Sequence, residues 1–367
     1  MDEIRINLAI VIPAYEPDEK LIGLINDLNN ELNDFTIVVV NDGSIKEESK
    51  KIFDEVKDMK NCHLISYDKN MGKGYALKEA FKYIKSLEQK YIIVTADSDG
   101  QHHPKDIKKV YDFYLKNQGM LVLGSRKFEG DVPKKSKFGN NVSRALTRIV
   151  FSERIYDTQT GLRAFSSDLI DFMLSIKGER YEYEINMISE TIRAAIPIRE
   201  VAIKTIYINE NKGTHFRPVK DFLRITSCQI KYLIPILLCL IVNSIAFALL
   251  RFFFYKYLGI DVVYLVFVTL VSGFFTVLTG LIVDGLGICF GNRYILKRKD
   301  LLANYIIRFL IIVVMDIIFV ELFARVFNFE QAYIPLAKIL SDLCLAIITV
   351  TLNVVFCHKS KLYEGEE

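Results

Sequence analysis

One apolar run in the chain ends in two acidic residues, reading Tyr91-Ile92-Ile93-Val94-Thr95-Ala96-Asp97-Ser98-Asp99-Gly100-Gln101. The apolar part is short and rich in β-branched residues, which predicts a buried strand over 91–95. Similar runs occur at 8–12, 35–40, 63–66 and 120–123, and amphipathic stretches lie between them at about 18–32, 46–58, 74–87 and 104–117. This alternation predicts an α/β domain with a mostly parallel sheet covered on both faces.

Polar residues follow several of the predicted strand ends, where such sheets bind their ligands. Asp97 and Asp99 could hold one divalent cation, with Gln101 as a neutral oxygen ligand. Taken alone, this acidic pattern is more typical of a solvated turn, and residues 41–44 (Asn-Asp-Gly-Ser) are also typical of a turn. Residues 72–74 (Gly-Lys-Gly) lack the rest of a phosphate loop, which argues against a kinase, an ATPase or a dinucleotide-binding protein.

The pattern is less regular from 126 to 220, with helices predicted near 138–151, 168–175 and 183–195 and a strand near 199–206. We place a domain boundary near 220. Residues 221–231 have an apolar side and a basic side, so we expect them to lie along a membrane surface. Residues 358–367 form a polar tail.

Residues 232–357 contain long apolar runs, and we expect an all-α membrane domain with four transmembrane helices at about 232–254, 262–287, 302–324 and 333–357. The basic stretch 292–299 follows the second span, which places it in the cytosol. An even number of spans returns the C-terminus to the side of the first domain. Because the N-terminal residues lack the apolar core of a signal peptide, we expect a multi-pass cell-membrane protein with its first domain in the cytosol.

Composition excludes two classes of protein. With 51% hydrophobic residues the chain is not a disordered one, and 47 basic against 44 acidic residues give a net charge of only +3, with no basic stripe for nucleic acid. The six cysteines show no C-x-x-C spacing, so we interpret them as buried thiols of a reducing compartment, neither disulfides nor zinc ligands.

Six motifs occur in order along the first domain, at 12–15, 40–44, 70–74, 97–104, 124–126 and 157–163. Together they resemble a family 2 glycosyltransferase of the GT-A (Rossmann-like) fold, of the polyprenol-phosphate type to which dolichol-phosphate mannose synthase belongs. The resemblance covers about residues 1–220. The apolar half resembles the GtrA-like membrane domain fused to some of these enzymes. Residues 157–161 are similar to dolichyl-phosphate glucosyltransferases, which favours UDP-glucose as the donor.

The resemblance implies roles for individual residues. The nucleotide sugar would be bound by Pro13, Tyr15, Glu16, Asp42, Lys73, Asp97 and Ser98, and Mg²⁺ or Mn²⁺ by Asp97, Asp99 and Gln101. The catalytic set would be Asp99, Arg126, Glu184 and Arg163, and the acceptor phosphate would lie near Arg144, Lys212, His215 and Arg217. Two departures affect these roles: Pro17 stands where the family has Glu, and residues 210–216 differ from the family's late basic motif.

Simpler interpretations stand beside several of these roles. Arg144 and Arg163 are the kind of residue that often lies at a surface or caps a helix. Glu182 and Glu184 would also be favourable merely as negative charges at a helix N-terminus. We interpret His102 and His103 as loop residues before a helix that starts at Pro104.

The expected function is an inverting, metal-dependent transfer of one hexose from a nucleotide sugar to a polyprenyl phosphate. A phosphate monoester is ionised at neutral pH, so the acceptor needs no strong base. GDP-mannose is the alternative donor. Charged residues inside the later spans, such as Arg308 and Asp316, keep open a different class, a lipid-sugar transporter or scaffold with a nucleotide-sugar-sensing domain. Whether the chain forms a homo-oligomer is left open.

Overall fold

A computed structural model describes residues 6–126, 134–151, 153–194, 196–204 and 218–230, with isolated positions between 245 and 363. The helices are α1 (Lys20–Glu31), α2 (Glu47–Asp58), α3 (Lys73–Ser86), α4 (Pro104–Lys116), α5 (Lys134–Phe151), α6 (Ile170–Ser175), α7 (Glu182–Arg193) and α8 (Pro218–Ile230). The strands are β1 (Asn7–Ala14), β2 (Phe35–Asp42), β3 (Cys62–Tyr67), β4 (Tyr91–Thr95), β5 (Leu121–Arg126), β6 (Glu153–Arg154), β7 (Arg163–Ser166), β8 (Ile198–Ile203), β9 (His358–Lys359) and β10 (Leu362–Tyr363).

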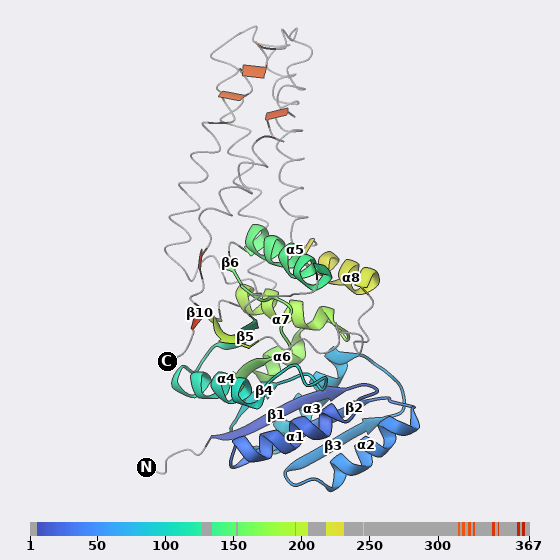
Figure 1. Ribbon diagram of the computed structural model, residues 1–367. Coiled ribbons are helices and arrows are strands. Elements are labelled where there is room, and N and C mark those ends of the chain that lie inside the picture. The colour runs from blue at the N-terminus through green and yellow to red at the C-terminus, as the bar shows by residue number, and fades with distance from the viewer. Residues whose placement is uncertain are drawn as a thin grey trace.

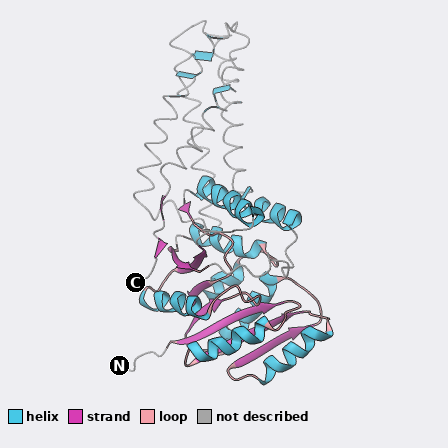
Figure 2. Cartoon of the chain, viewed as in Figure 1, coloured by secondary structure: helices cyan, strands magenta, loops and turns pink. Residues whose placement is uncertain are grey.

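Eight of the strands form one sheet in the order β10-β8-β5-β7-β4-β1-β2-β3 (Figure 2). All pairs are parallel except those of β7, which runs antiparallel between β4 and β5. The predicted mostly parallel sheet is therefore confirmed. Strand β7 was not predicted from the sequence, because its four residues follow a polar loop directly and show no extended apolar run.

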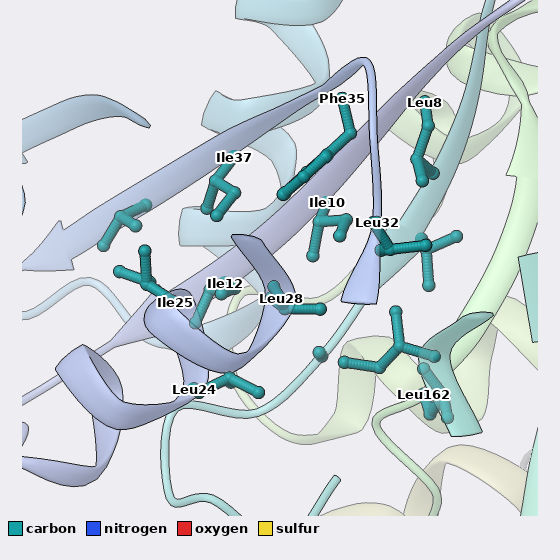
Figure 3. Packing of buried hydrophobic residues seen from close by; sticks show 14 of the residues in the cluster. Leu8, Ile10, Ile12, Leu24, Ile25, Leu28, Leu32, Phe35, Ile37 and Leu162 are labelled. Carbon is teal, nitrogen blue, oxygen red and sulfur yellow. The ribbon is translucent and has the colours of Figure 1, made fainter. Parts of the chain in front are cut away.

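Helices cover both faces of the sheet (Figure 1). Alternate residues of β1 point to opposite faces, so Ile10 and Ile12 join the core beneath α1, α2 and α4, whereas Ala9 and Val11 pack with α3, α6 and α7. In α1 the buried residues recur at helical spacing, as in Leu21, Ile25 and Leu28. Figure 3 shows this helix packed on the β1–β2 pair. The two cores fix the strand ends that carry the polar loops.

Helix α8 packs against α5 through buried polar contacts. The Gln229 Nε2 atom donates to Thr147 Oγ1 at 2.7 Å, and Ser143 Oγ lies 3.3 Å from Gln229 Oε1. Ile225 is buried and Leu223 is exposed. The helix begins at Pro218, just before the predicted boundary at 220, so the segment predicted to lie on a membrane is a helix that contacts the α/β domain.

Two short strands near the end of the chain, β9 and β10, pair with strands of the α/β domain. His358–Lys359 pairs with Glu153–Arg154, and Leu362–Tyr363 adds a strand to the large sheet beside β8. The four predicted membrane spans fall almost wholly outside the described residues. Within the described part of the chain, no helix is long and apolar enough to cross a bilayer.

Three cysteines lie among the described residues, Cys62, Cys228 and Cys344; all are half-buried, and none of the three is in a disulfide. Burial raises the pKa of the Cys62 thiol to about 11. Because the thiolate is the reactive form, we expect iodoacetamide at pH 8 to modify Cys62 about 100-fold more slowly in the native chain than in the urea-unfolded chain. Peptide mass spectrometry after timed labelling measures both rates. Equal rates would show that burial does not raise this pKa.

Candidate functional site

A lysine and two carboxylates meet at the carboxyl end of β4. The Lys73 Nζ atom lies 2.6 Å from Asp97 Oδ1 and 2.8 Å from Glu184 Oε1. His102 Nε2 lies 3.2 Å from the other Asp97 oxygen. Lys73 opens α3, Asp97 follows β4 and Glu184 lies in the first turn of α7. We call these four residues the Asp97 cluster, and three of them were predicted as site residues from the sequence.

The charges of the Asp97 cluster stabilise one another. Burial alone would lower the pKa of Lys73, but Asp97 and Glu184 outweigh burial and raise it above its ordinary value. Burial would likewise raise the pKa of Asp97, but the charges of Lys73 and His102 outweigh it and hold that pKa well below its usual range. Lys73 and Asp97 are therefore both charged at neutral pH.

Asp99 differs from Asp97 in its surroundings. Burial, followed by the neighbouring negative charge of Asp97, raises the pKa of Asp99, although Asp99 Oδ1 accepts a hydrogen bond from the Gln101 backbone N–H at 3.0 Å. A divalent cation would relieve this repulsion, and two carboxylates with an amide oxygen form a donor set that Mg²⁺ and Mn²⁺ accept. The predicted ligands therefore fit a hard cation. Among the described residues no group of three or more His, Cys, Asp or Glu side chains is placed to hold a metal.

The loop at 157–162 lies against Asp97 and forms hydrogen bonds both with the end of β4 and with β5. Thr95 Oγ1 donates to the Gly161 carbonyl at 2.7 Å, and Thr160 Oγ1 donates to the Gly124 carbonyl at 2.6 Å. A Cβ atom on Gly161 would lie 2.4 Å from Asp97 Oδ2. Glycine at this position therefore lets the backbone approach the carboxylate closely, because it has no Cβ atom.

Two carboxylates predicted to bind the nucleotide sugar make contacts within the protein. Both oxygens of Asp42 accept hydrogen bonds from the loop at 67–72, including the backbone N–H of Gly72. Glu16 accepts hydrogen bonds from the loop at 45–49. Both side chains thus shape the loops beyond β1 and β2. Their contact with a nucleotide stays a prediction.

The other residues predicted to bind the nucleotide sugar or the metal lie at the carboxyl ends of the same strands. Pro13 is buried at the end of β1, and Tyr15 follows it half-buried. Ser98 and Gln101 are half-buried in the loop after β4. The carboxyl ends of β1, β2 and β4, which are neighbours in the sheet, therefore carry this set of predicted residues.

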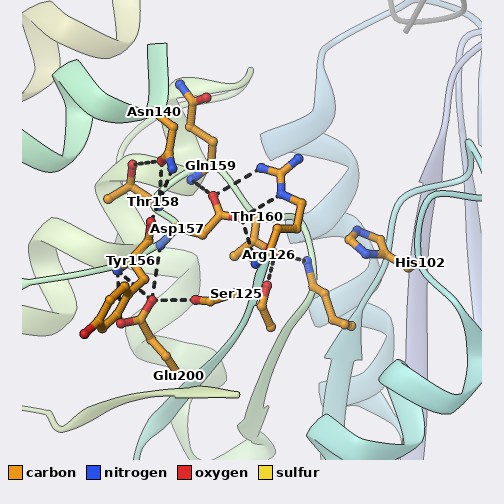
Figure 4. Close-up of polar contacts among 12 residues, drawn as sticks. His102, Ser125, Arg126, Asn140, Tyr156, Asp157, Thr158, Gln159, Thr160 and Glu200 are labelled. Carbon is orange, nitrogen blue, oxygen red and sulfur yellow. Dashed lines mark hydrogen bonds and ion pairs between the residues drawn. The ribbon is translucent and has the colours of Figure 1, made fainter. Parts of the chain in front are cut away.

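Arg126 is held by a buried carboxylate at the end of β5 (Figure 4). Its Nε lies 2.6 Å from Asp157 Oδ2 and its Nη2 lies 3.1 Å from Asp157 Oδ1. Asp157 is fully buried. Behind it, the buried Glu200 of β8 accepts hydrogen bonds from the Ser125 hydroxyl and from the backbone N–H groups of Tyr156 and Asp157. The guanidinium of Arg126 is therefore fixed in direction.

The other predicted arginines differ from one another. Arg163 is only 1% exposed, and its guanidinium donates to the carbonyls of Thr160 and Glu184. The resemblance placed Arg163 in the catalytic set, whereas in the structure its side chain turns inward from β7 and joins two backbone segments. Arg144 is half-buried, with its guanidinium carbon 5.9 Å from the centre of the Tyr156 ring. The predicted acceptor residues Lys212, His215 and Arg217 lie outside the described residues.

Comparison with known proteins connects this site to a family. Residues 9–173 match the model described as Glycosyl transferase family 2. The chain is 31% identical over 216 residues to the UDP-N-acetylglucosamine–dolichyl-phosphate N-acetylglucosaminyltransferase of Methanococcus voltae, covering 54% of this chain and 85% of that protein. The chain belongs to glycosyltransferase family 2. The described α/β part thus has the GT-A-like glycosyltransferase fold that the sequence predicted.

Two further similarities concern a relative and a solved structure. The chain is 26% identical over 257 residues to a dolichyl-phosphate beta-glucosyltransferase of Dictyostelium discoideum, covering 63% of this chain and 76% of that protein. It is 17% identical to glucosyl-3-phosphoglycerate synthase of Mycobacterium tuberculosis, whose crystal structure contains Mn²⁺, UDP and glucosyl-3-phosphoglycerate. That match has a TM-score of 0.46 and covers 62% of this chain and 78% of that chain.

Gly161→Ala is expected to lower the transferase rate about 10-fold or more, because the new methyl group would displace a carboxylate that Lys73 and His102 hold in place. Steady-state kinetics on the purified full chain measures the loss. Gly23→Ala in α1 is the matched control, because nothing lies within 4 Å of its added Cβ. A Gly161→Ala enzyme with the wild-type rate would show that the position of Asp97 does not matter for transfer.

Sequence reasoning missed three residues of this site. His102 was interpreted as a loop residue; it does lie in a loop, but it is buried against Asp97. Asp157 was noted only as part of a motif, and Glu200 was not singled out. A pattern that would have found Glu200 is a charged residue inside an apolar strand, Ile198-Arg199-Glu200-Val201-Ala202-Ile203. Such a residue usually needs a buried partner.

Proposed function

We propose that this family 2 glycosyltransferase transfers one hexose from a nucleotide sugar to a polyprenyl phosphate. The observation that carries the proposal is the Asp97 cluster, with a fixed arginine nearby on β5, at the sheet edge where such folds bind ligands. The names of the two curated relatives support a dolichyl-phosphate acceptor. UDP-glucose is the favoured donor, and GDP-mannose is the alternative.

In the proposed reaction, an oxygen of the acceptor phosphate attacks the anomeric carbon of the donor sugar. The bond between that carbon and the diphosphate oxygen breaks, and the nucleoside diphosphate leaves with the electron pair, so the configuration inverts. The acceptor is already an oxyanion above its second pKa near 6, so no protein base has to remove a proton. The site has to bring two anions together and stabilise the departing diphosphate.

The residues divide this work between them. Arg126 faces phosphate, and Lys73 holds the side chains of Asp97 and Glu184 in position through its two ion pairs. Asp97, Asp99 and Gln101 would hold Mg²⁺ or Mn²⁺, which would supply positive charge to the diphosphate. Glu184 lies beside the sugar or the acceptor. Arg163 fixes the backbone of α7 from within.

The apolar half is proposed to anchor the transferase in the cell membrane as a GtrA-like domain with four spans at 232–357. A polyprenyl phosphate keeps its tail in the hydrocarbon, so the site has to be held near the headgroups. The pairing of β10 with β8 puts Leu362 and Tyr363 in the sheet of the α/β domain, which supports placing both on one side of the membrane. We propose that this side is the cytosol.

Product analysis tests the proposal. The purified full chain in lipid nanodiscs is incubated with polyprenyl phosphate and, in separate reactions, with UDP-glucose, UDP-N-acetylglucosamine and GDP-mannose. We expect one of these donors to give a lipid whose mass has increased by one sugar, with release of the nucleoside diphosphate. Binding of a donor without transfer from any of them would favour a sensor joined to a transporter or scaffold.

A further inference from the structure

Asp157 and Glu200 form a pair of buried acidic residues behind Arg126, and neither belongs to the predicted set of site residues. Asp157 and Glu200 are both 0% exposed. Burying a carboxylate is costly unless hydrogen bonds or a cation compensate it. Both oxygens of Asp157 contact the Arg126 guanidinium, and Glu200 accepts hydrogen bonds from three donors around the same loop. The cost of burying the two carboxylates is therefore offset by hydrogen bonds. Those of Asp157 hold Arg126 directly, and those of Glu200 hold the backbone of Asp157.

The geometry of the Arg126–Asp157 contact is that of a two-point pair. Two guanidinium nitrogens face two carboxylate oxygens, which fixes the plane as well as the position of the arginine. The Arg126 backbone N–H also donates to Asp157 Oδ2 at 3.3 Å, so the end of β5 and its side chain are held by the same group. The contact uses Nε and Nη2 of the guanidinium, and these two nitrogens lie on one side of the planar group.

The Glu200 carboxylate holds Asp157 from behind. Its Oε1 accepts from the Asp157 backbone N–H at 3.2 Å and from that of Tyr156 at 2.8 Å. Glu200 lies opposite Leu123 in the β5–β8 register, on the strand beside the one that ends in Arg126. Figure 4 shows Glu200, Ser125, Asp157 and Arg126 joined in one chain of contacts.

The same loop also contacts the second predicted phosphate-binding arginine. The Arg144 guanidinium lies over the ring of Tyr156, whose backbone N–H is bound by Glu200. Asn140 on α5 accepts from both the backbone N–H and the hydroxyl of Thr158. The loop at 156–158 thus connects α5 with the end of β5, and it contacts both arginines.

We propose that Asp157 is a positioning residue that sets the direction of Arg126 toward an anionic diphosphate, with Glu200 fixing Asp157. The inference rests on the proposed function, because it requires a phosphate-bearing substrate at Arg126. It predicts that loss of the Asp157 charge weakens recognition of phosphate groups specifically. It also predicts that this loss acts through Arg126 alone.

The test is a double-mutant cycle on the full chain in nanodiscs, with affinities for UDP, GDP, uridine and guanosine measured by calorimetry. Asp157→Asn should bind the preferred diphosphate about 10-fold more weakly, with unchanged affinity for the matching nucleoside. In an Arg126→Ala background, Asp157→Asn should cause little further loss. Asp106→Asn, which changes a buried carboxylate of α4 that accepts from the Lys204 backbone N–H, should leave diphosphate affinity unchanged.

Two results would overturn the inference. One is a loss of diphosphate affinity in Asp157→Asn that is equally large in the Arg126→Ala background, and the other is an equal loss for the nucleoside. If Asp157→Asn does not fold, Arg126→Lys makes the same test, because lysine keeps the charge but cannot form the two-point pair. Wild-type diphosphate affinity in Arg126→Lys would then overturn it. A wild-type chain that binds neither diphosphate would instead contradict the proposed function.

Discussion

Asp99→Asn is expected to lower the rate of sugar transfer by about 100- to 1,000-fold while the chain stays folded. In the proposed site this carboxylate helps to hold the cation that stabilises the departing diphosphate. Burial and Asp97 raise the pKa of Asp99, whereas the pKa of Asp97 is lowered, so the protein compensates the charge of Asp99 less than that of Asp97. The amide keeps the size of the side chain and removes that charge. Initial rates of nucleoside diphosphate release measure the loss.

The control for this variant is Asp168→Asn, because the Asp168 side chain is 67% exposed and lies away from the Asp97 cluster. It should keep the wild-type rate. Wild-type enzyme treated with EDTA should also lose activity and regain it with Mg²⁺ or Mn²⁺. Full activity of the EDTA-treated enzyme would contradict the metal role of Asp97 and Asp99.

Lys73→Met is expected to destabilise the α/β domain by about 3–5 kcal/mol. It removes the lysine ammonium group and leaves Asp97 and Glu184 largely buried without that ion-pair partner. Pulse proteolysis of the full chain in increasing urea measures the free energy of unfolding. Lys82→Met is the matched control, since Lys82 is 57% exposed and pairs with Glu79 on the same helix. That variant should lose less than about 1 kcal/mol.

The pH dependence of the Lys73→Met effect follows from the lowered pKa of Asp97. A carboxylate with a lowered folded-state pKa adds stability above its unfolded pKa of about 3.9, and this stability is lost as the pH falls through the folded-state pKa. The difference between wild type and Lys73→Met should therefore shrink below about pH 4.

A triple variant separates charge from packing. Adding Asp97→Asn and Glu184→Gln to Lys73→Met should recover part of the stability, because no uncompensated charge is left in the cluster. A triple variant that is less stable than Lys73→Met would show that packing of the lysine stem, and not its charge, stabilises this site.

The strands and helices that the sequence predicted are those with local signals. The run at 91–95 is apolar and β-branched, and the structure has a strand over the same residues. The helix predicted from Pro104 begins there, where His103 Nδ1 accepts from the Lys105 backbone N–H. β7 could not be predicted in the same way, because its place in the sheet depends on two partners, β4 and β5, that are remote in the sequence.

The candidate site was predictable in its residue types and less so in its contacts. Asp97, Asp99 and Lys73 lie in motifs, but nothing near Lys73 in the sequence indicates that Glu184 would reach it from α7. Likewise, the sequence alone does not distinguish an aspartate that binds a ligand from one, such as Asp42, that accepts hydrogen bonds from the backbone of a loop. Only the fold shows that its oxygens accept hydrogen bonds from residues 67–72.

The central claim is that the phosphate of a lipid is the acceptor of the sugar. The most direct measurement compares polyprenyl phosphate with the matching polyprenol in the same nanodiscs, with wild-type and Asp99→Asn full chains and the preferred donor. Wild type should convert the phosphate to a lipid one sugar heavier and leave the alcohol unchanged, and Asp99→Asn should convert neither at a comparable rate. Equal transfer to the alcohol, or donor turnover that does not depend on either lipid, would contradict the account.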